Sequence, residues 1–247
     1  MLDKERKLLP RLGVRKLHYQ IRDSLVLKDI KIGRDALFTL LRKHQMLIIP
    51  KRKYVITTMS KHWLRKYPNL IKGIEVNGKD QVWVSDITYI KTDEGNCYLN
   101  LITDVWSRKI VGYAIAENME AKQMKQAFLM ALKQRTLKEA PLIHHSDRGL
   151  QYCSSEYTSI AHENNIQISM TENGDPYENA LAERMNRTLK EEFGLGRILL
   201  SRNHAKLLVT EAVDLYNNYR PHSSLSMKTP QSVYKQNSPI LANQGTS

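Results

Sequence analysis

Residues 82–90 read VWVSDITYI, a run of apolar, β-branched and aromatic side chains interrupted by Asp86. Both alternating faces of this run are mostly apolar, which is typical of a strand covered on both sides of a sheet. A carboxylate in such a strand needs hydrogen bonds, a cation or a metal ion, because burying a bare charge is very costly. Asp86 is therefore either a functional carboxylate with such a partner or a strand-end residue that faces water. This stretch alone does not decide between the two.

The bulk composition favours a globular protein that folds in water. Of the 247 residues, 41% are hydrophobic and 26% are charged, which suits one large or two unequal domains. No apolar run approaches the length of a membrane span, and the first residues are too charged for a signal peptide. Cys97 and Cys153 form no C-x-x-C motif, so we expect a cytoplasmic protein without a disulfide framework or a cysteine zinc site.

The net charge of +13 is concentrated near the amino terminus. Residues 1–55 hold fifteen Lys or Arg against five Asp or Glu, whereas the remaining 192 residues hold 23 against 20. The stretches 13–25 and 34–44 each carry apolar residues at helical spacing with basic residues off that stripe. Two such helices predict a small helix-turn-helix-like module that binds DNA. An anionic membrane surface is the competing partner, but no helix here has the bulky apolar face it would need.

A larger domain follows this module. We expect a basic module over 1–55, a linker or docking segment over 56–80, a catalytic core over 81–236 and a polar tail over 237–247. The core begins with three antiparallel strands and continues with alternating helices and strands. The expected strands are 82–90, 97–106, 109–116, 141–146 and 166–170, and the expected helices are 119–137, 154–165 and one from about 176.

A second acidic residue ends the strand LIHHS. Asp147 lies before Arg148 and Gly149, where the chain turns away from the strand. Ligand and metal groups gather at such strand ends in α/β sheets. A turn-stabilising Asp before Gly is an equally good interpretation. The neighbouring His144 and His145 point to opposite faces of a strand, so we do not expect them to form a metal site.

A third acidic residue, Glu183, lies on a helix with strong start signals. Asp175 suits the N-cap, Pro176 the first helical position and Glu178 the capping box. The apolar stripe that should face the core consists of Leu181, Met185 and Leu189. Glu183 lies opposite that stripe, together with Asn179, Asn186, Arg187 and Lys190. On its own this is an ordinary solvated face with a minor Glu183–Arg187 ion pair.

The combination of the three acids decides between these interpretations. Asp147 and Glu183 are separated by 35 residues, 148–182. The chain resembles the DDE transposases and retroviral-type integrases, whose acidic triad has this D-35-E spacing, and more narrowly the IS3 family of insertion-sequence transposases. The matching stretches are WVSDITYI, LITDVWSRKIVGYAI, HHSDRGLQY, GDPYENALAERMNRTLKEEF and YNNYRPHSSLSMKTPQSVY.

The resemblance implies both a fold and a chemistry. The fold is an α/β RNase H-like catalytic core, a five-stranded mixed sheet flanked by helices, preceded by a small basic all-α helix-turn-helix-like module. The triad is Asp86, Asp147 and Glu183, which would hold two Mg²⁺ ions, with Mn²⁺ as a substitute. The reaction is nicking of element ends followed by transfer of a 3′-hydroxyl strand. The partners are double-stranded DNA, as terminal inverted repeats and target, and further copies of the chain in a homo-oligomer.

Several basic residues are expected to contact DNA. Arg187 and Lys190 follow Glu183 on one helical face, and Arg220 and His222 lie where a helix ends at Pro221. The others lie in the basic module: Arg34, Arg42, Lys43, Lys51, Arg52 and Lys53. Family members often carry a further amino-terminal segment encoded in an upstream frame. The chain is therefore expected to be a second-frame product that acts with such a segment or fusion.

Three alternatives remain open from the residues. Asp104 is a further acidic residue in a matching stretch, but a role at the entry to a turn fits it better than metal binding. Glu117 and Glu120 lie near the first core helix, from which ribonuclease H enzymes draw a carboxylate. The whole chain would otherwise be a structure-specific nuclease that cuts without joining, or a non-catalytic DNA-binding regulator derived from a transposase.

Overall fold

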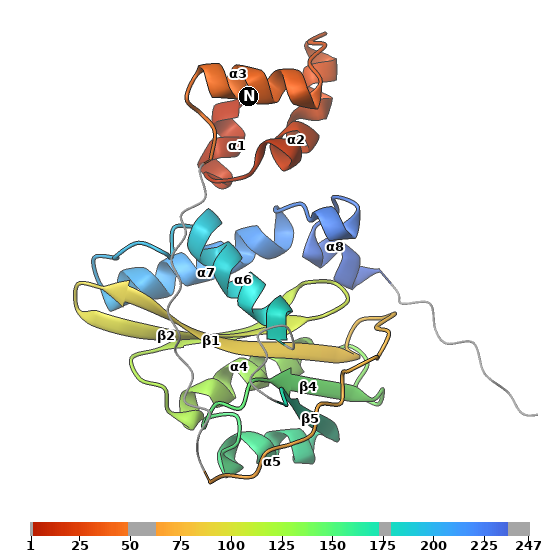
Figure 1. Cartoon of the computed structure of the whole chain (residues 1–247), viewed down its shortest axis with the longest axis vertical. Coiled ribbons are helices and arrows are strands. Elements are labelled where there is room, and N and C mark those ends of the chain that lie inside the picture. Colours follow the sequence, from red (N-terminus) through yellow and green to blue (C-terminus); the bar gives the residue numbers. More distant parts are fainter. Residues whose placement is uncertain (1, 49–62, 173–178, 237–247) are drawn as a thin grey trace, which may run out of the picture.

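The computed structural model describes residues 2–48, 63–172 and 179–236. Its centre is one mixed sheet with the strand order β3-β2-β1-β4-β5 (Figure 1). The antiparallel part consists of β1 (Val82–Thr92), β2 (Gly95–Asp104) and β3 (Ile110–Ala116). The parallel part adds β4 (Leu142–Ser146) beside β1 and β5 (Ile166–Met170) beside β4. The predicted five-stranded mixed sheet is confirmed, and β1 lies at its centre.

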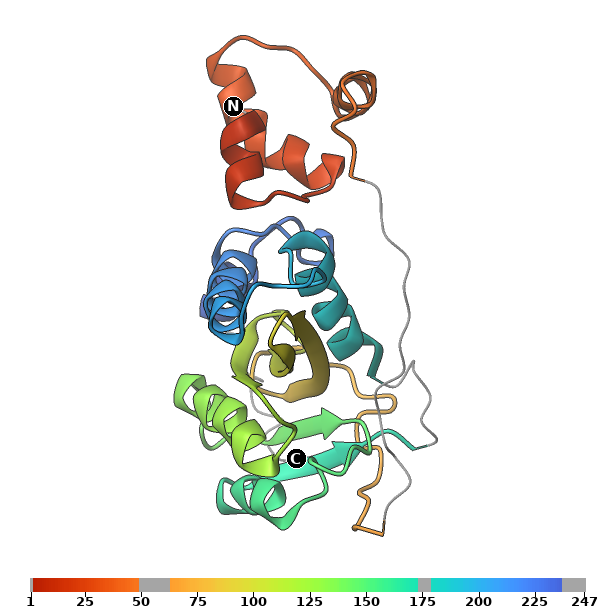
Figure 2. The same ribbon diagram turned by 90° about the vertical axis from the view of Figure 1, so that its left-hand side faces the viewer.

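Helices cover both faces of the sheet, which is why β1 is apolar on both sides (Figure 1). Helices α4 (Ala121–Gln134) and α5 (Ser155–Glu163) lie on one face. Helices α6 (Ala180–Glu192) and α7 (Arg202–Asn218) lie on the other, and Figure 2 shows the same layers from the side. A short 3₁₀ turn (Ser223–Leu225) and α8 (Pro230–Lys235) follow.

Helix α4 packs unusually close to β3 at Gly112. A Cβ atom on Gly112 would lie 2.1 Å from the backbone oxygen of Ala127 and 3.0 Å from the Cβ of Ala131. Only a residue without a side chain therefore permits this approach of helix to strand. The contact fixes the height of α4 above the antiparallel half of the sheet.

The turn from β2 into β3 is organised by Asp104, as predicted for a residue at a turn entry. Its Oδ1 accepts hydrogen bonds from the backbone and the hydroxyl of Ser107, and its Oδ2 accepts one from the backbone of Asp80 at 2.8 Å. Asp104 is fully buried. Burial raises its pKa to about 6, against the lowering effect of these hydrogen bonds. Asp104 is therefore a structural carboxylate.

The amino-terminal part forms three helices, α1 (Leu2–Leu8), α2 (Val14–Leu27) and α3 (Arg34–Lys43). The predicted helices α2 and α3 are confirmed, whereas α1 was not predicted. The apolar residues at helical spacing in these two helices are mostly buried: Leu17, Ile21, Leu25, Leu37 and Leu41 are at most 7% exposed, whereas Leu40 is 40% exposed. Leu17, Ile21 and Leu37 belong to one continuous apolar cluster that reaches residues of α6 and α7. The basic module therefore packs on the core beside the α6 and α7 layer.

Two predictions concern residues outside or beside the described ranges. The N-cap, proline and capping-box residues expected before Glu183 (Asp175, Pro176, Glu178) lie outside the described residues, and α6 is described from Ala180 with Asn179 at its N-cap. The predicted domain boundaries near 55 and 237 also fall within or beside undescribed segments and stay predictions. Within the described ranges, no helix is long and apolar enough to cross a membrane.

Candidate active site

Asp86 lies near the middle of the central strand β1, next to the end of β4. Ser85 is the last β1 residue paired with β4, opposite Ser146, and Asp86 is paired with Leu101 of β2. The two carboxylate oxygens accept different donors. Oδ1 accepts the backbone N–H of Ile87 at 2.8 Å, and Oδ2 accepts the side-chain amide of Asn186 at 2.9 Å. The half-buried carboxylate is therefore held in one orientation.

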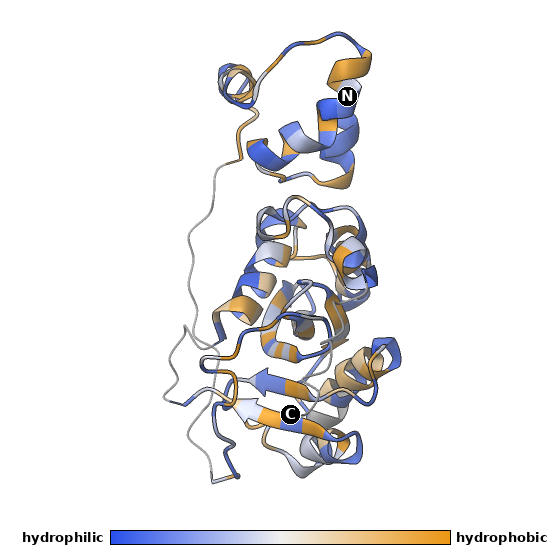
Figure 3. Cartoon of the chain, turned by 90° about the vertical axis from the view of Figure 1, so that its right-hand side faces the viewer, coloured by the Kyte–Doolittle hydropathy of each residue, from blue (hydrophilic) through white to orange (hydrophobic). Residues whose placement is uncertain are grey.

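Asp147 directly follows β4 at its carboxyl end. The sequence of β4, LIHHS, changes from apolar to polar along the strand, and Figure 3 shows this change in its colouring. Oδ1 of Asp147 accepts the backbone N–H of Gly149 at 3.0 Å, and a Cβ on Gly149 would lie 3.0 Å from that oxygen. One oxygen of Asp147 therefore stabilises the turn, and the charge of this half-buried carboxylate also acts on Asp86; a metal-binding role for Asp147 stays a prediction.

Electrostatic interactions join the three carboxylates of the predicted triad. Burial, the charge of Asp147 and the weaker charge of Glu183 raise the pKa of Asp86 to about 7, although the amide of Asn186 opposes this. Burial and the charge of Asp147 also raise the pKa of Glu183, while Arg187 lowers it. The charges of the triad therefore act on one another across β1, the end of β4 and the first turns of α6.

The donor set fits a hard divalent cation in its chemistry. All three groups supply carboxylate oxygens, which Mg²⁺ and Mn²⁺ prefer, and a cation would relieve the mutual repulsion that, after burial, raises the pKa of Asp86. The three carboxylates do not form a complete coordination shell. In the described part of the chain, no three His, Cys, Asp or Glu side chains are close enough together to hold one ion. Glu183, on α6, is exposed, whereas Asp86 and Asp147 are half-buried.

The polar face of α6 is only partly solvated, which corrects the sequence-based prediction. Asn179 and Asn186 are 4% and 5% exposed. Asn179 donates its side-chain amide to the backbone oxygen of Ser85 at 3.0 Å, and Asn186 donates to Asp86. The sequence offered one signal for this contact: two uncharged amides, seven residues apart, share one helical face with Glu183.

A buried polar cluster supports β1 on the opposite side of the sheet. The hydroxyl of Ser85 lies 2.9 Å from Oδ1 of Asn100 and 2.8 Å from the hydroxyl of Tyr152, which in turn donates to Asn100 at 3.0 Å. All three side chains are at most 2% exposed. These contacts favour one conformation of the strand on which Asp86 lies, although the amide nitrogen of Asn100 is buried without a hydrogen-bond partner among the residues that the structure describes. These residues were not predicted from the sequence.

Two basic side chains of α6 lie near the carboxylates. The ammonium group of Lys190 lies 4.4 Å from the centre of the Tyr89 ring. Burial lowers the pKa of Lys190, and the charge of Asp86 acts in the opposite direction. Arg187 is exposed and interacts with Glu183. Both positions are suitable for binding phosphates beside the carboxylates, and their contact with DNA stays a prediction.

The predicted DNA contact of Arg220 is corrected to an internal ion pair. Its guanidinium is 4% exposed and donates to both carboxylate oxygens of Glu192, at 2.7 and 2.6 Å. His222 is half-buried, with Nε2 lying 2.8 Å from the hydroxyl of Tyr216. Burial and then nearby Arg220 lower the pKa of His222 to about 3, so its ring is neutral. Contact between His222 and DNA stays a prediction.

The predicted contacts in the basic module lie on exposed parts of α3. Arg34 pairs with Asp35 at 2.7 Å, and the guanidinium of Arg42 lies 4.9 Å from the centre of the Phe38 ring. Lys43 is exposed in the last turn. Lys51, Arg52 and Lys53 lie outside the described residues.

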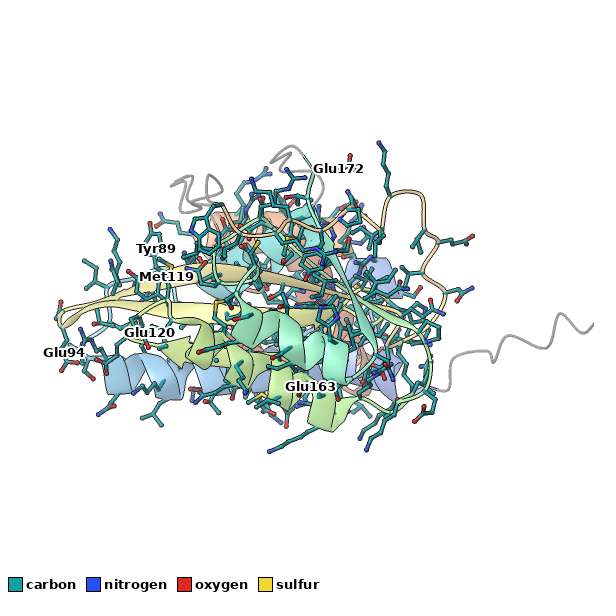
Figure 4. All side chains as sticks on the ribbon, turned by 90° about the horizontal axis from the view of Figure 1, so that it is seen from below. Tyr89, Glu94, Met119, Glu120, Glu163 and Glu172 are labelled. Atoms are coloured by element: carbon teal, nitrogen blue, oxygen red, sulfur yellow. The ribbon has the colours of Figure 1, made fainter. Side chains whose placement is uncertain are left out.

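The alternative acidic residues take other roles. Glu117 pairs with Arg202 at 2.5 Å, and Glu120 accepts the side-chain amide of Asn118 at 2.8 Å. Glu120 is the N-cap residue of α4, and Figure 4 shows it at the surface near Met119. His144 and His145 are buried and bonded to Tyr157 and Ser169. One ring nitrogen of each histidine makes this contact, and Nδ1 of His144 is buried without a hydrogen-bond partner anywhere in the described chain.

Comparison with known proteins places the geometry in a family context. The integrase core domain family matches residues 76–176, and a second integrase core domain family matches residues 164–230. The insertion element IS600 uncharacterized 31 kDa protein of Shigella sonnei is 36% identical over 220 residues, covering 88% of this chain and 79% of that protein. Transposase InsF for insertion sequence IS3A of Escherichia coli K12 is 33% identical over 199 residues, covering 80% of this chain and 69% of that protein.

Solved structures are similar in fold. The catalytic core domain of HTLV-2 integrase, solved in complex with magnesium, has a TM-score of 0.51 at 20% identity and covers 64% of this chain and 97% of that one. A chain of the simian T-cell lymphotropic virus intasome, solved in complex with the PP2A regulatory subunit B56 gamma, has a TM-score of 0.57 at 18% identity. That match covers 95% of this chain and 78% of that one. The likeness confirms the predicted integrase-type arrangement of sheet and helices.

Proposed function

The chain belongs to the IS3 family of insertion-sequence transposases, which are DDE-type polynucleotidyl transferases, and we propose that it nicks the ends of its element and joins the freed 3′-hydroxyl groups to target DNA with Mg²⁺ or Mn²⁺. One observation carries this proposal. Asp86 lies on β1 beside the end of β4, which Asp147 follows, and α6, which carries Glu183, contacts Asp86 through Asn186 at 2.9 Å. The magnesium found with the HTLV-2 integrase core supports the choice of cation.

The proposed roles follow from the positions of the side chains. Asp86 and Asp147 would be the inner ligands, because both are half-buried at the edge between β1 and β4, and Glu183 would supply its carboxylate from the exposed side. When bound, the divalent cations activate the attacking oxygen and neutralise charge on the phosphoryl oxygens. Lys190 and Arg187 would bind phosphates next to the carboxylates. This arrangement needs no nucleophilic side chain, so we propose that no covalent intermediate forms on the protein.

The proposed partners are double-stranded DNA, as terminal inverted repeats and target, and further copies of this chain. The module of α1 to α3 would provide a sequence-independent part of the affinity through its basic surface, because neutralising phosphates releases counterions. The intasome likeness supports a multimeric assembly on DNA. We also propose a cytoplasmic, DNA-associated location.

The test uses the duplex DNA that flanks the gene, labelled on each strand, with Mg²⁺. Asp86→Asn, Asp147→Asn and Glu183→Gln should each abolish nicking while DNA binding persists. Asp104→Asn is the matched control, because Asp104 is also a buried carboxylate with a raised pKa but belongs to the turn between β2 and β3. Its folded fraction should still cut DNA.

The products distinguish the proposal from its competitors. Joined strands support a transposase, cutting without joining would indicate a structure-specific nuclease, and binding without cutting would indicate a regulator. Near-normal cleavage by any one of the three variants would remove that residue from the triad.

A further inference from the structure

One helical face of α6 is directed at β1 through a row of polar side chains. Asn179, Glu183, Asn186 and Lys190 follow one another at intervals of four, three and four residues, which places them on one side of a helix. Two of them reach β1 directly, because Asn179 bonds to the backbone of Ser85 and Asn186 bonds to the carboxylate of Asp86. Glu183 lies between these two contacts along the helix.

The two asparagines are buried at a position where apolar residues would normally pack. Both are at most 5% exposed, and a buried amide that lost its partner would be costly. Asparagine is also a poorer helix former than leucine or alanine. The benefit of these residues therefore lies in their hydrogen bonds to β1, which fix α6 at two points along the strand.

The contacts of the two asparagines differ in kind. Asn179 bonds to a backbone oxygen, so it anchors the start of α6 whatever side chain stands at position 85. Asn186 bonds to Oδ2 of Asp86, while the backbone of Ile87 occupies Oδ1. Together these two donors prevent the carboxylate of Asp86 from rotating.

We propose that Asn186 is a positioning residue for the metal-binding carboxylate of Asp86, and that its contact fixes Asp86 relative to Glu183 on the same helix. This inference rests on the proposed function of the triad. Partners that orient a ligand in this way commonly change metal affinity by about 10–100-fold when they are removed. Asn186 would thus link the rigid strand to the helix that supplies the third carboxylate.

The experiment compares two matched variants of the full chain, Asn186→Leu and Asn179→Leu. Each replaces one buried amide of α6 with an apolar side chain of similar size, but only Asn186 touches a carboxylate. The measurements are melting temperature in EDTA, Mn²⁺ affinity by electron paramagnetic resonance, and kcat and KM for cleavage. Both variants should melt at a lower temperature than the original chain. Only Asn186→Leu should weaken Mn²⁺ binding by about 10-fold or more and lower kcat at an unchanged KM.

A second variant covers the case in which Asn186→Leu does not fold. Asn186→Ser is smaller and polar but too short to reach Asp86, and it should show the same loss of Mn²⁺ affinity. Unchanged Mn²⁺ affinity in the Asn186 variants would overturn the inference, and so would an equal loss in Asn179→Leu. An original chain that binds no Mn²⁺ would instead refute the metal role of the triad, and the inference with it.

Discussion

Replacing Asp86 by asparagine should stabilise the metal-free protein at neutral and alkaline pH, although it abolishes the proposed activity. Burial and the neighbouring Asp147 raise the pKa of Asp86 from 3.8 to about 7. A carboxyl group with a raised pKa stabilises the fold fully below its unfolded pKa, and this contribution is lost as the pH rises through the folded value. Above about pH 7 the charged carboxylate therefore lowers the free energy of unfolding. An uncharged amide at this position removes that destabilisation.

The size of the effect follows from two opposing terms. A shift of about three pKa units corresponds to a ceiling of about 4 kcal/mol, at about 1.4 kcal/mol per unit. Asparagine has one acceptor oxygen, so it cannot serve both the N–H of Ile87 and the amide of Asn186. Losing one hydrogen bond costs about 1–2 kcal/mol. A net gain of about 1–3 kcal/mol remains, or roughly 2–10 °C in melting temperature for a chain of this size.

Thermal denaturation in EDTA between pH 4 and pH 8.5 measures this gain. The difference between Asp86→Asn and the original chain should be near zero or negative at pH 4 and should grow as the pH rises through about 7. Added Mg²⁺ should raise the melting temperature of the original chain but not that of the variant. Asp104→Asn should show the same kind of pH dependence at lower pH, because burial raises the pKa of Asp104 to about 6. A difference for Asp86→Asn that does not change with pH would refute the reasoning.

Three other perturbations have definite expected results. Mg²⁺ or Mn²⁺ should support cleavage, whereas Ca²⁺ should bind without supporting it because its bonds are longer and its geometry looser; full activity in excess chelator would contradict a metal role. Replacing Arg34, Arg42 and Lys43 together by alanine should flatten the salt dependence of DNA binding by about one unit of log–log slope per lost phosphate contact; an unchanged slope in binding titrations would remove α3 from the DNA interface. Gly112→Ala should cost about 1–3 kcal/mol in denaturant titrations because its Cβ meets the backbone of Ala127. Gly13→Ala has open space around its Cβ and should cost less, about 0.5–1 kcal/mol, because alanine is a poorer N-cap for α2.

The strands and the acidic triad could be predicted from the sequence because local patterns encode them. β1 is apolar on both faces since helices cover both sides of the sheet, and Asp86 interrupts that run visibly. The spacing between Asp147 and Glu183 is likewise a property of the chain itself. α1 was missed because seven mostly charged residues, none of them fully buried, carry no periodic signal.

The contacts that orient the site could not be predicted in this way, because they join distant parts of the chain. Asn186 lies 100 residues from Asp86 along the sequence, and a polar residue opposite an apolar stripe normally faces water. Arg220 was predicted to contact DNA for the same reason, because its partner Glu192 lies 28 residues away along the sequence. Which polar side chains face inward depends on how helices pack, and that is a tertiary property.

The apolar cluster shared by the basic module and the core has a consequence for how the chain unfolds. Leu17 and Ile21 of α2 pack into the same cluster as Met185 and Leu189 of α6. Detaching the module would expose that surface to water, so we expect module and core to melt in one cooperative transition. Helix α6 also carries Glu183. The denaturant concentration that detaches the module should therefore also separate Glu183 from Asp86 and Asp147.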